Sequence, residues 1–133
     1  MNGIKLLLCE DDDDIRVFLV ELLGLHGYEV TAVSTVAAAN EQVATTEFAV
    51  ALLDIALPDG SGLSVARAIR AAKRDVRPRL IAISGHSSTS DQIVARDAGF
   101  DMFLVKPVTE KQLLAALSVG RLTPQELRYP VDP

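Results

Sequence analysis

The sequence predicts a single α/β domain built on a doubly wound, five-stranded parallel sheet with five helices. Short apolar runs alternate along the chain with segments in which apolar residues recur every three or four positions. A strand, a helix and a second parallel strand make a right-handed crossover, so this alternation places helices on both faces of the sheet. The length of 133 residues suits one domain and is enough to bury most of the surface that the unfolded chain exposes.

The first strand and the first helix open the chain. Residues 4–9 form an apolar run, which is the expected strand. In the next segment the apolar residues fall on one helical face, and Gly24 and Gly27 mark its end. The residues of this face are Ile15, Phe18, Leu19, Leu22 and Leu23.

The second strand, the second helix and the third strand follow. Residues 28–33 are rich in residues that favour strands. Residues 36–45 form an Ala-rich helix, for which Ser34 or Thr35 is the expected N-cap. Residues 48–53 are apolar throughout, which is typical of a central parallel strand covered on both faces.

Turn-forming residues separate the third strand from the third helix. They fill residues 57–62, after which residues 63–72 resume helical spacing. Residues 80–84 supply the fourth strand. A loop over residues 85–90 then leads to the fourth helix over residues 91–98.

The last strand and the last helix carry clear local signals. Gly99 is expected to end the fourth helix in a left-handed conformation, and residues 102–105 supply the fifth strand. Thr109 and Gln112 have the spacing of a capping box, so the fifth helix should cover residues 110–119.

Composition limits both the domain count and the classes of partner. We expect one domain over residues 1–121 and a proline-containing tail or linker over residues 122–133. The formal net charge of -5 disfavours direct binding to nucleic acid or to anionic membranes. Cys9 is the single cysteine, so no internal disulfide can form and we expect a reduced, cytoplasmic protein. The sequence contains no run of about 20 apolar residues that could cross a membrane.

Residues able to do chemistry stand at the ends of four expected strands. Glu10 and Asp11 follow the first strand, and Asp54 follows the third. Ser84 ends the fourth strand, and Lys106 follows the fifth. Parallel strands end at one edge of the sheet, where open α/β sheets place their sites, so we expect these side chains to converge. Asp54 is the leading candidate for the reactive group.

Four motifs, in order, resemble a known family. They are LLLCEDD over residues 6–12, LLDIALPDG over 52–60, IAISGH over 81–86 and GFDMFLVKP over 99–107. The separations of 30 residues from Asp54 to Ser84 and 22 from Ser84 to Lys106 are also similar to those of the family. From residue 4 to about residue 119 the chain resembles a receiver domain, the phospho-accepting module of bacterial two-component response regulators. The resemblance implies a flavodoxin-like (CheY-like) fold.

The resemblance implies a phosphotransfer role for Asp54. This residue would accept a phosphoryl group from a phosphohistidine on a sensor histidine kinase or a histidine phosphotransfer protein. The implied metal ligands are Glu10, Asp11, Asp54 and the backbone carbonyl of Ala56, and the implied metal is Mg²⁺, which prefers oxygen ligands. Such a domain catalyses only its own phosphotransfer and dephosphorylation, so it is a signalling domain and not an enzyme with a separate substrate.

The resemblance also implies a switch. Lys106 would pair with the phosphoryl oxygens, and Ser84 would donate a hydrogen bond to the phosphoryl group. Phe103 stands where the family has an aromatic residue that changes rotamer when the adjoining loop moves. Ala56 and His86 stand at positions where side chains tune the lifetime of the acyl phosphate, and we expect hydrolysis to depend strongly on His86.

Other functions fit the residues less well. A phosphohydrolase with an aspartyl nucleophile has a second acid two residues further on, where this chain has Ala56. No G-x-G-x-x-G follows the first strand, and Arg16 stands where a calcium-binding EF-hand loop needs glycine. The remaining alternative is a degenerate receiver that binds partners in one fixed state, although such a domain is expected to lack one or more of the site residues that are present here.

The output of the domain and its assembly stay open. The chain fits a single-domain regulator that docks on a downstream protein target. It also fits a receiver taken from a larger protein, such as a hybrid histidine kinase. A phosphorylation-dependent homodimer formed through the surface of the fourth and fifth helices is also compatible with the sequence.

Overall fold

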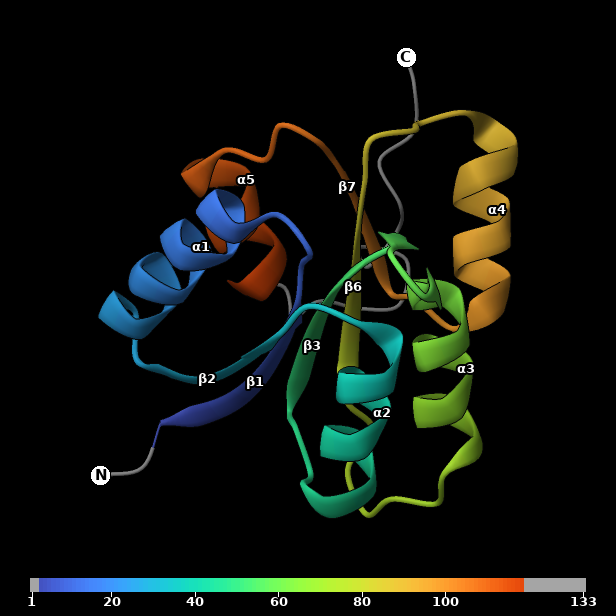
Figure 1. Cartoon of the computed structure of the whole chain (residues 1–133), viewed down its shortest axis with the longest axis horizontal. Coiled ribbons are helices and arrows are strands. Elements are labelled where there is room, and N and C mark those ends of the chain that lie inside the picture. The colour runs from blue at the N-terminus through green and yellow to red at the C-terminus, as the bar shows by residue number, and fades with distance from the viewer. Residues whose placement is uncertain (1–2, 119–133) are drawn as a thin grey trace.

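The computed structural model describes residues 3–118, which form a five-stranded parallel sheet with helices on both faces (Figure 1). The strand order is β2-β1-β3-β6-β7. The strands are β1 (Ile4–Cys9), β2 (Tyr28–Val33), β3 (Val50–Asp54), β6 (Arg79–Ser84) and β7 (Met102–Val105). The helices are α1 (Asp13–Leu25), α2 (Val36–Thr45), α3 (Gly62–Ala71), α4 (Thr89–Ala98) and α5 (Glu110–Ser118). The prediction of a doubly wound α/β domain is confirmed.

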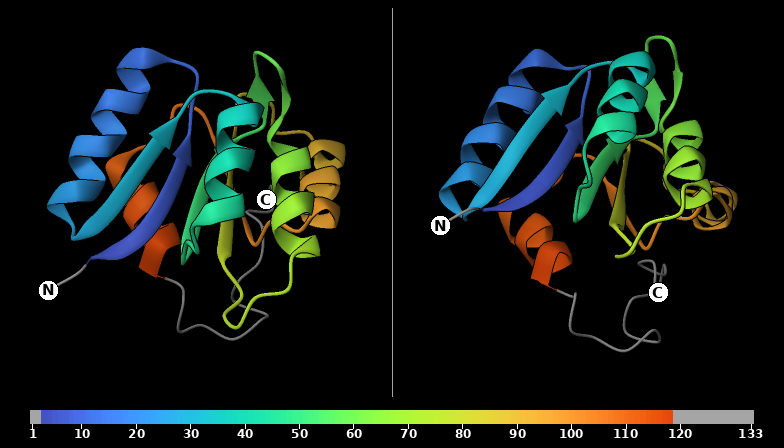
Figure 2. Two further views of the ribbon diagram at one scale, coloured as in Figure 1. Left: turned by 60° about the horizontal axis from the view of Figure 1, so that its bottom comes forward. Right: turned by 90° about the horizontal axis from the view of Figure 1, so that it is seen from below.

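Two layers of helices cover the sheet. Helices α1 and α5 pack on one face, and α2, α3 and α4 pack on the other (Figures 1 and 2). Successive residues of β1 alternate between these layers, since Leu7 packs with the α2 to α4 side while Leu6 and Leu8 pack with the α1 and α5 side. Burial on both faces explains why the central strands β1, β3 and β6 are apolar over most of their length.

Strand boundaries differ slightly from those predicted. β3 was expected over residues 48–53, but it begins at Val50 and includes Asp54, which pairs with the neighbouring strand β6. β6 begins one residue earlier than predicted, at Arg79. Residues 57–62, predicted as a turn, take part in a short antiparallel hairpin of β4 (Ala56–Leu57) and β5 (Gly60–Ser61).

Helix boundaries were wrong where a capping interaction was missed. α4 begins at Thr89, two residues earlier than predicted, because Ser88 and Asp91 form a capping box. α3 begins one residue earlier than predicted, at Gly62. Gly24 lies inside α1 and does not end it.

Other local predictions are confirmed. Thr35, and not Ser34, caps α2 by accepting a hydrogen bond from a backbone N–H of its first turn. Gly99 follows α4 with φ of 113°, in the left-handed region. Thr109 and Gln112 exchange the two hydrogen bonds of a capping box at 3.0 and 3.1 Å.

Two predictions fall outside residues 3–118. They are the end of the last helix at residue 119 and the boundary between a domain over 1–121 and a tail over 122–133. Within the described range, no helix has the length and apolar character needed to cross a membrane.

The apolar face predicted for α1 is buried along only part of its length. Leu19, Leu22 and Leu23 lie in the core. Ile15 and Phe18, by contrast, are 36% and 52% exposed, although their spacing is the same. The exposed end of this face borders the functional site described below.

Candidate functional site

The sheet brings the predicted site residues to one edge. Parallel pairing sets Cys9 opposite Leu53 at adjacent strand ends, so Glu10 and Asp54 emerge next to each other. Glu10 and Asp54 are almost completely buried, at 0% and 2% exposure. The prediction of convergence is therefore confirmed for these two carboxylates.

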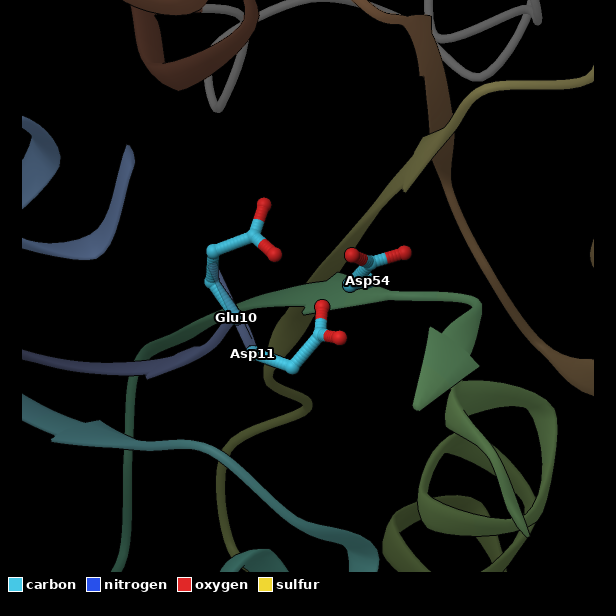
Figure 3. A group of neighbouring side chains, drawn as sticks. All are labelled: Glu10, Asp11 and Asp54. Carbon is cyan, nitrogen blue, oxygen red and sulfur yellow. The ribbon is translucent and has the colours of Figure 1, made fainter. Parts of the chain in front are cut away.

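Three carboxylates face a common point (Figure 3). One oxygen each from Glu10, Asp11 and Asp54 lies within 4.8 Å of the other two. Glu10 and Asp11 come from the end of β1, and Asp54 comes from the end of β3 (Figure 3). Asp11 is exposed, so this cluster opens to solvent on its side.

The carboxylate oxygens differ in their protein contacts. Asp54 Oδ1 accepts a hydrogen bond of 3.0 Å from the backbone N–H of Ala56, and Glu10 Oε2 accepts one of 3.2 Å from the backbone N–H of Asp12. Glu10 Oε1 is buried without a hydrogen-bond partner. A buried anionic oxygen without a hydrogen bond is costly unless a cation compensates for it. The donor set is made of hard oxygen ligands, and it therefore fits Mg²⁺.

Lys106 supplies a cation from the protein itself. Its Nζ lies 2.7 Å from Asp54 Oδ2 and forms a hydrogen bond there. It also lies 3.0 Å from Glu10 Oε1, with which it forms an ion pair. Burial lowers the pKa of Lys106, but the contacts with Asp54 and Glu10 outweigh this effect and raise it above the usual lysine value. The lysine therefore stays charged at neutral pH.

The turn after β7 contains a cis peptide bond between Lys106 and Pro107. The backbone N–H of Lys106 donates a hydrogen bond of 2.8 Å to the carbonyl of Ser84. This bond ties the lysine to the end of the neighbouring strand, so Lys106 and Ser84 hold their positions together.

Ser84 and His86 form a small turn at the end of β6. Ser84 is 5% exposed, and its Oγ accepts a hydrogen bond of 3.0 Å from the backbone N–H of His86. His86 is exposed. Phe103 is fully buried and packs in the cluster that includes Ala95 and Ala98 of α4.

Asp59 has a role that the sequence reasoning missed. It was assigned only to the turn after β3, yet its carboxylate accepts hydrogen bonds of 2.7 and 3.0 Å from the backbone N–H groups of Val36 and Ala37. These two bonds lower the pKa of Asp59. Together with Thr35 they satisfy the first N–H groups of α2, so the hairpin after Asp54 is tied to the start of that helix. No local sequence signal pointed to this contact, which joins segments more than 20 residues apart.

Comparison with known proteins agrees with this geometry. The family described as response regulator receiver domain matches residues 6–118. The transcriptional regulatory protein GltR of Pseudomonas aeruginosa is 34% identical over 116 residues, which make up 87% of this chain and 48% of GltR. The response regulator protein PilR of the same species is 33% identical over 134 residues, which cover 99% of this chain and 30% of PilR. The chain thus spans about half of the length of such relatives or less.

Solved structures give the same result. A CheY-like receiver domain protein from Methanospirillum hungatei has a TM-score of 0.82 at 25% identity, with 95% of this chain and 97% of that chain covered. The receiver domain of the sensor histidine kinase PA1611 from Pseudomonas aeruginosa, whose structure has a magnesium ion in the active site cleft, has a TM-score of 0.78 at 29% identity, with 86% and 94% covered. Sequence motifs, fold and the geometry of the strand ends lead to one conclusion, which is that the chain belongs to the response regulator receiver domain family.

Proposed function

We propose that Asp54 accepts a phosphoryl group from a phosphohistidine, on a sensor histidine kinase or a histidine phosphotransfer protein, in a Mg²⁺-dependent reaction. The observation that carries the proposal is the pairing of a buried Asp54 carboxylate with Lys106 at 2.7 Å, beside two further carboxylates that fit a divalent cation. Asp54 is the only one of the three carboxylates that stands on β3, and Glu10 and Asp11, which follow β1, are the other proposed metal ligands.

The transfer requires charge neutralisation more than covalent machinery. A carboxylate oxygen of Asp54 forms a bond to phosphorus, while the bond from phosphorus to the donor imidazole nitrogen breaks and its electron pair stays on that nitrogen. Mg²⁺, when held by Glu10, Asp11, Asp54 and the carbonyl of Ala56, would neutralise the incoming phosphoryl oxygens. Lys106 supplies a further positive charge, since its Nζ lies 2.7 Å from Asp54 Oδ2. Domains of this kind act on themselves, so we propose that the catalysis is limited to phosphotransfer and loss of the same phosphoryl group.

We propose that Ser84 and Phe103 convert this charge change into a change of surface. The Ser84 hydroxyl accepts a hydrogen bond from His86, which leaves its own proton available for a phosphoryl oxygen. A shift of Ser84 toward that oxygen would carry the loop before α4 with it. Phe103 packs in the same cluster as Ala95 of α4, so a change of its rotamer would alter the packing of this helix.

We propose that His86 sets the lifetime of the acyl phosphate, because Ala56 offers only a methyl group at the other position near Asp54. His86 is exposed and lies in the turn at Ser84, where its side chain can meet an incoming water. The variant His86→Ala should lose its phosphoryl group at a changed rate, measured by intact mass against time. An unchanged rate would contradict this role.

We propose that the phosphodonor docks in a groove beside the site. The groove has a volume of about 320 Å³, and Lys106 is the only charged residue among the described residues that line it. It is lined by Ile15, Phe18, Leu19, Ile83, Lys106, Pro107 and Val108. Since Lys106 contacts Asp54, a helix seated there would hold its phosphohistidine against the acceptor. Docking of the donor in this groove would explain why an apolar residue, Phe18, is partially exposed there.

A variant in this groove distinguishes an effect on donor docking from an effect on the phosphorylation reaction itself. Phe18→Ala should slow phosphotransfer from a histidine kinase that phosphorylates the wild type, yet leave phosphorylation by acetyl phosphate unchanged. Equal kinase rates for the two proteins would show that the donor does not dock there.

We propose that the downstream partner reads the surface of α4 and β7. Ile93 and Val94 of α4 and Val105 of β7 are apolar and between 36% and 44% exposed. A second copy of the chain is one candidate partner for this surface. Sedimentation velocity with and without phosphorylation tests it, because identical profiles would count against dimerisation. The net charge of -5 gives no support to direct binding of nucleic acid by this domain.

Intact mass spectrometry after incubation with acetyl phosphate tests the central proposal. The wild type should gain one phosphoryl group with Mg²⁺ and none with excess chelator, whereas Asp54→Asn should gain none. A folded wild type that binds Mg²⁺ but gains no phosphoryl group would overturn the proposal and favour a receiver that acts in one fixed state.

A further inference from the structure

Arg16 of α1 reaches back to the turn that carries two of the three carboxylates. Its Nη1 donates a hydrogen bond of 2.9 Å to the backbone carbonyl of Glu10 and lies 3.5 Å from the carbonyl of Asp11. Its Nη2 lies 2.6 Å from Asp13 Oδ1. One planar guanidinium therefore joins the end of β1 to the first turn of α1, a bridging geometry that suits arginine better than lysine.

The other side of the same turn is held separately. The backbone N–H of Glu10 donates to the carbonyl of Val33 in β2 at 3.0 Å, and the backbone N–H of Asp12 donates to the carboxylate of Glu10 at 3.2 Å. Arg16 adds the contacts on the carbonyl side. The direction in which the Glu10 and Asp11 side chains leave the backbone thus depends on a residue that is itself not a ligand.

We infer that Arg16 is a positioning residue for the metal site, which it organises through the backbone carbonyls of Glu10 and Asp11. This inference rests on the proposed Mg²⁺ site. Groups that orient metal ligands through hydrogen bonds change metal affinity about 10- to 100-fold when they are removed. Arg16 does so without contributing a ligand atom.

The charge of Arg16 alone predicts the opposite effect on Mg²⁺ affinity. Arg16 is a cation close to a cation site, so its positive charge opposes Mg²⁺ binding by Coulomb's law. Removal of that charge would tighten Mg²⁺ binding if the backbone contacts were irrelevant. Removal of the contacts should instead weaken binding, because Glu10 and Asp11 would no longer be held in place.

Calorimetric titration of the unphosphorylated protein with Mg²⁺ tests this sign. In Arg16→Met the aliphatic stem is kept while both donors and the charge are lost, and we expect Mg²⁺ to bind about 10-fold more weakly or worse. In Arg16→Lys the charge is kept, but one ammonium cannot span the carbonyls and Asp13, so we expect an intermediate affinity. Arg96→Met is the matched control, because it removes the same charge from an exposed pair with Asp97 at 3.7 Å. Its affinity should stay within about twofold of the wild type, as expected for an exposed pair.

A second measurement needs no metal. In the metal-free protein, hydrogen exchange at the backbone N–H of Asp12 should be faster in Arg16→Met, because the Glu10 carboxylate that holds it is less well ordered. Exchange at core amides such as that of Ile81 should match the wild type, which shows that the fold is intact. Should Arg16→Met fail to fold, Arg16→Lys carries the test by its own loss of affinity.

The outcomes distinguish a failure of the proposed function from a failure of the role of Arg16. A folded wild type that does not bind Mg²⁺ would overturn the proposed function, and with it the basis for this inference. A wild type that binds Mg²⁺, with Arg16→Met binding as tightly or more tightly, would overturn the role of Arg16 alone.

Discussion

Replacement of Gly62 by alanine is expected to displace the candidate acceptor. Gly62 is the first residue of α3, and its N–H donates a hydrogen bond of 2.9 Å to the carbonyl of Ile55. A Cβ added at Gly62 would overlap the carbonyl oxygen of Asp54, and it would lie 3.0 Å from the carbonyl carbon of Asp54. These are backbone atoms, so no side-chain rotation can relieve the contact.

The size of the effect follows from these distances. Carbon atoms in contact lie about 3.5–4.0 Å apart, so the end of β3 and the start of α3 must separate by roughly 0.5–1 Å. Overpacking of this kind costs about 1–3 kcal/mol of folding free energy. A displacement of about 1 Å at a reacting group can reduce a rate about 100-fold. We therefore expect Gly62→Ala to be less stable than the wild type and to accept phosphate much more slowly.

Gly24→Ala is the matched control, since it makes the same change in a different setting. A Cβ at Gly24 meets nothing within 4 Å, and the residue lies inside α1. Alanine should stabilise this helix by about 0.5–1 kcal/mol and leave phosphorylation unchanged. The same substitution is thus expected to have opposite signs at the two sites.

Urea unfolding followed by circular dichroism gives the stability, and intact mass against time with acetyl phosphate gives the rate. A Gly62→Ala protein that is as stable as the wild type and accepts phosphate at the same rate would refute the reasoning. Loss of stability with an unchanged rate would instead show that Asp54 keeps its place while α3 moves.

Three further predictions follow from contacts away from the acceptor. Asp101→Ala removes an ion pair of 2.9 Å to Arg70 and one of 2.7 Å to Arg77, so it should lower the free energy of unfolding by about 2–3 kcal/mol. Asp97→Ala, in an exposed pair, should change the free energy of unfolding by less than about 0.5 kcal/mol. Urea unfolding measures both changes. Cys9 is fully buried, and burial together with nearby carboxylates raises its pKa to about 12, so Ellman's reagent should label it only in denaturant, and rapid labelling of the native protein would contradict this. The hydrogen bonds of Asp59 to α2 lower its pKa, so its stabilising contribution is present above the unfolded pKa near 3.8 and is lost as pH falls through the lower folded value. The stability difference between wild type and Asp59→Ala, measured by urea unfolding, should therefore shrink below about pH 4. A constant difference would argue against the cap.

The residues at the strand ends could be predicted from the apolar runs of the sequence alone. Glu10, Asp54 and Lys106 each follow an apolar run, and a parallel sheet turns that local fact into proximity. A shift of one or two residues in a strand boundary, as at Val50, does not alter which residue leaves the sheet at its edge. For this reason the site was predictable although the boundaries were not.

The start of α4 was predicted wrongly although the sequence contains the pattern that marks it. Ser88 and Asp91 have the spacing of a capping box, the same pattern that was recognised at Thr109 and Gln112. Recognition of the first box would have started α4 at the correct residue.

Other features belong to the tertiary structure. Asp59 caps a helix that precedes it in the chain by more than 20 residues, and nothing local marks that partner. Phe18 has the spacing of a core residue, but it is 52% exposed because the groove beside Lys106 leaves it without a cover. Periodicity shows which face of a helix is apolar and does not show where its cover ends.

The sequence by itself determined the alternation of strands and helices and the residues at the sheet edge, because hydrophobic period and chain order fix these. Its four motifs gave the resemblance to the receiver family. Only the tertiary structure decided how those residues are held. It shows Lys106 between Asp54 and Glu10, one buried Glu10 oxygen without a hydrogen bond, and Arg16 on the carbonyls of the β1 turn. Such contacts depend on distances of a few ångströms between separate elements, and a linear pattern of residues does not contain those distances.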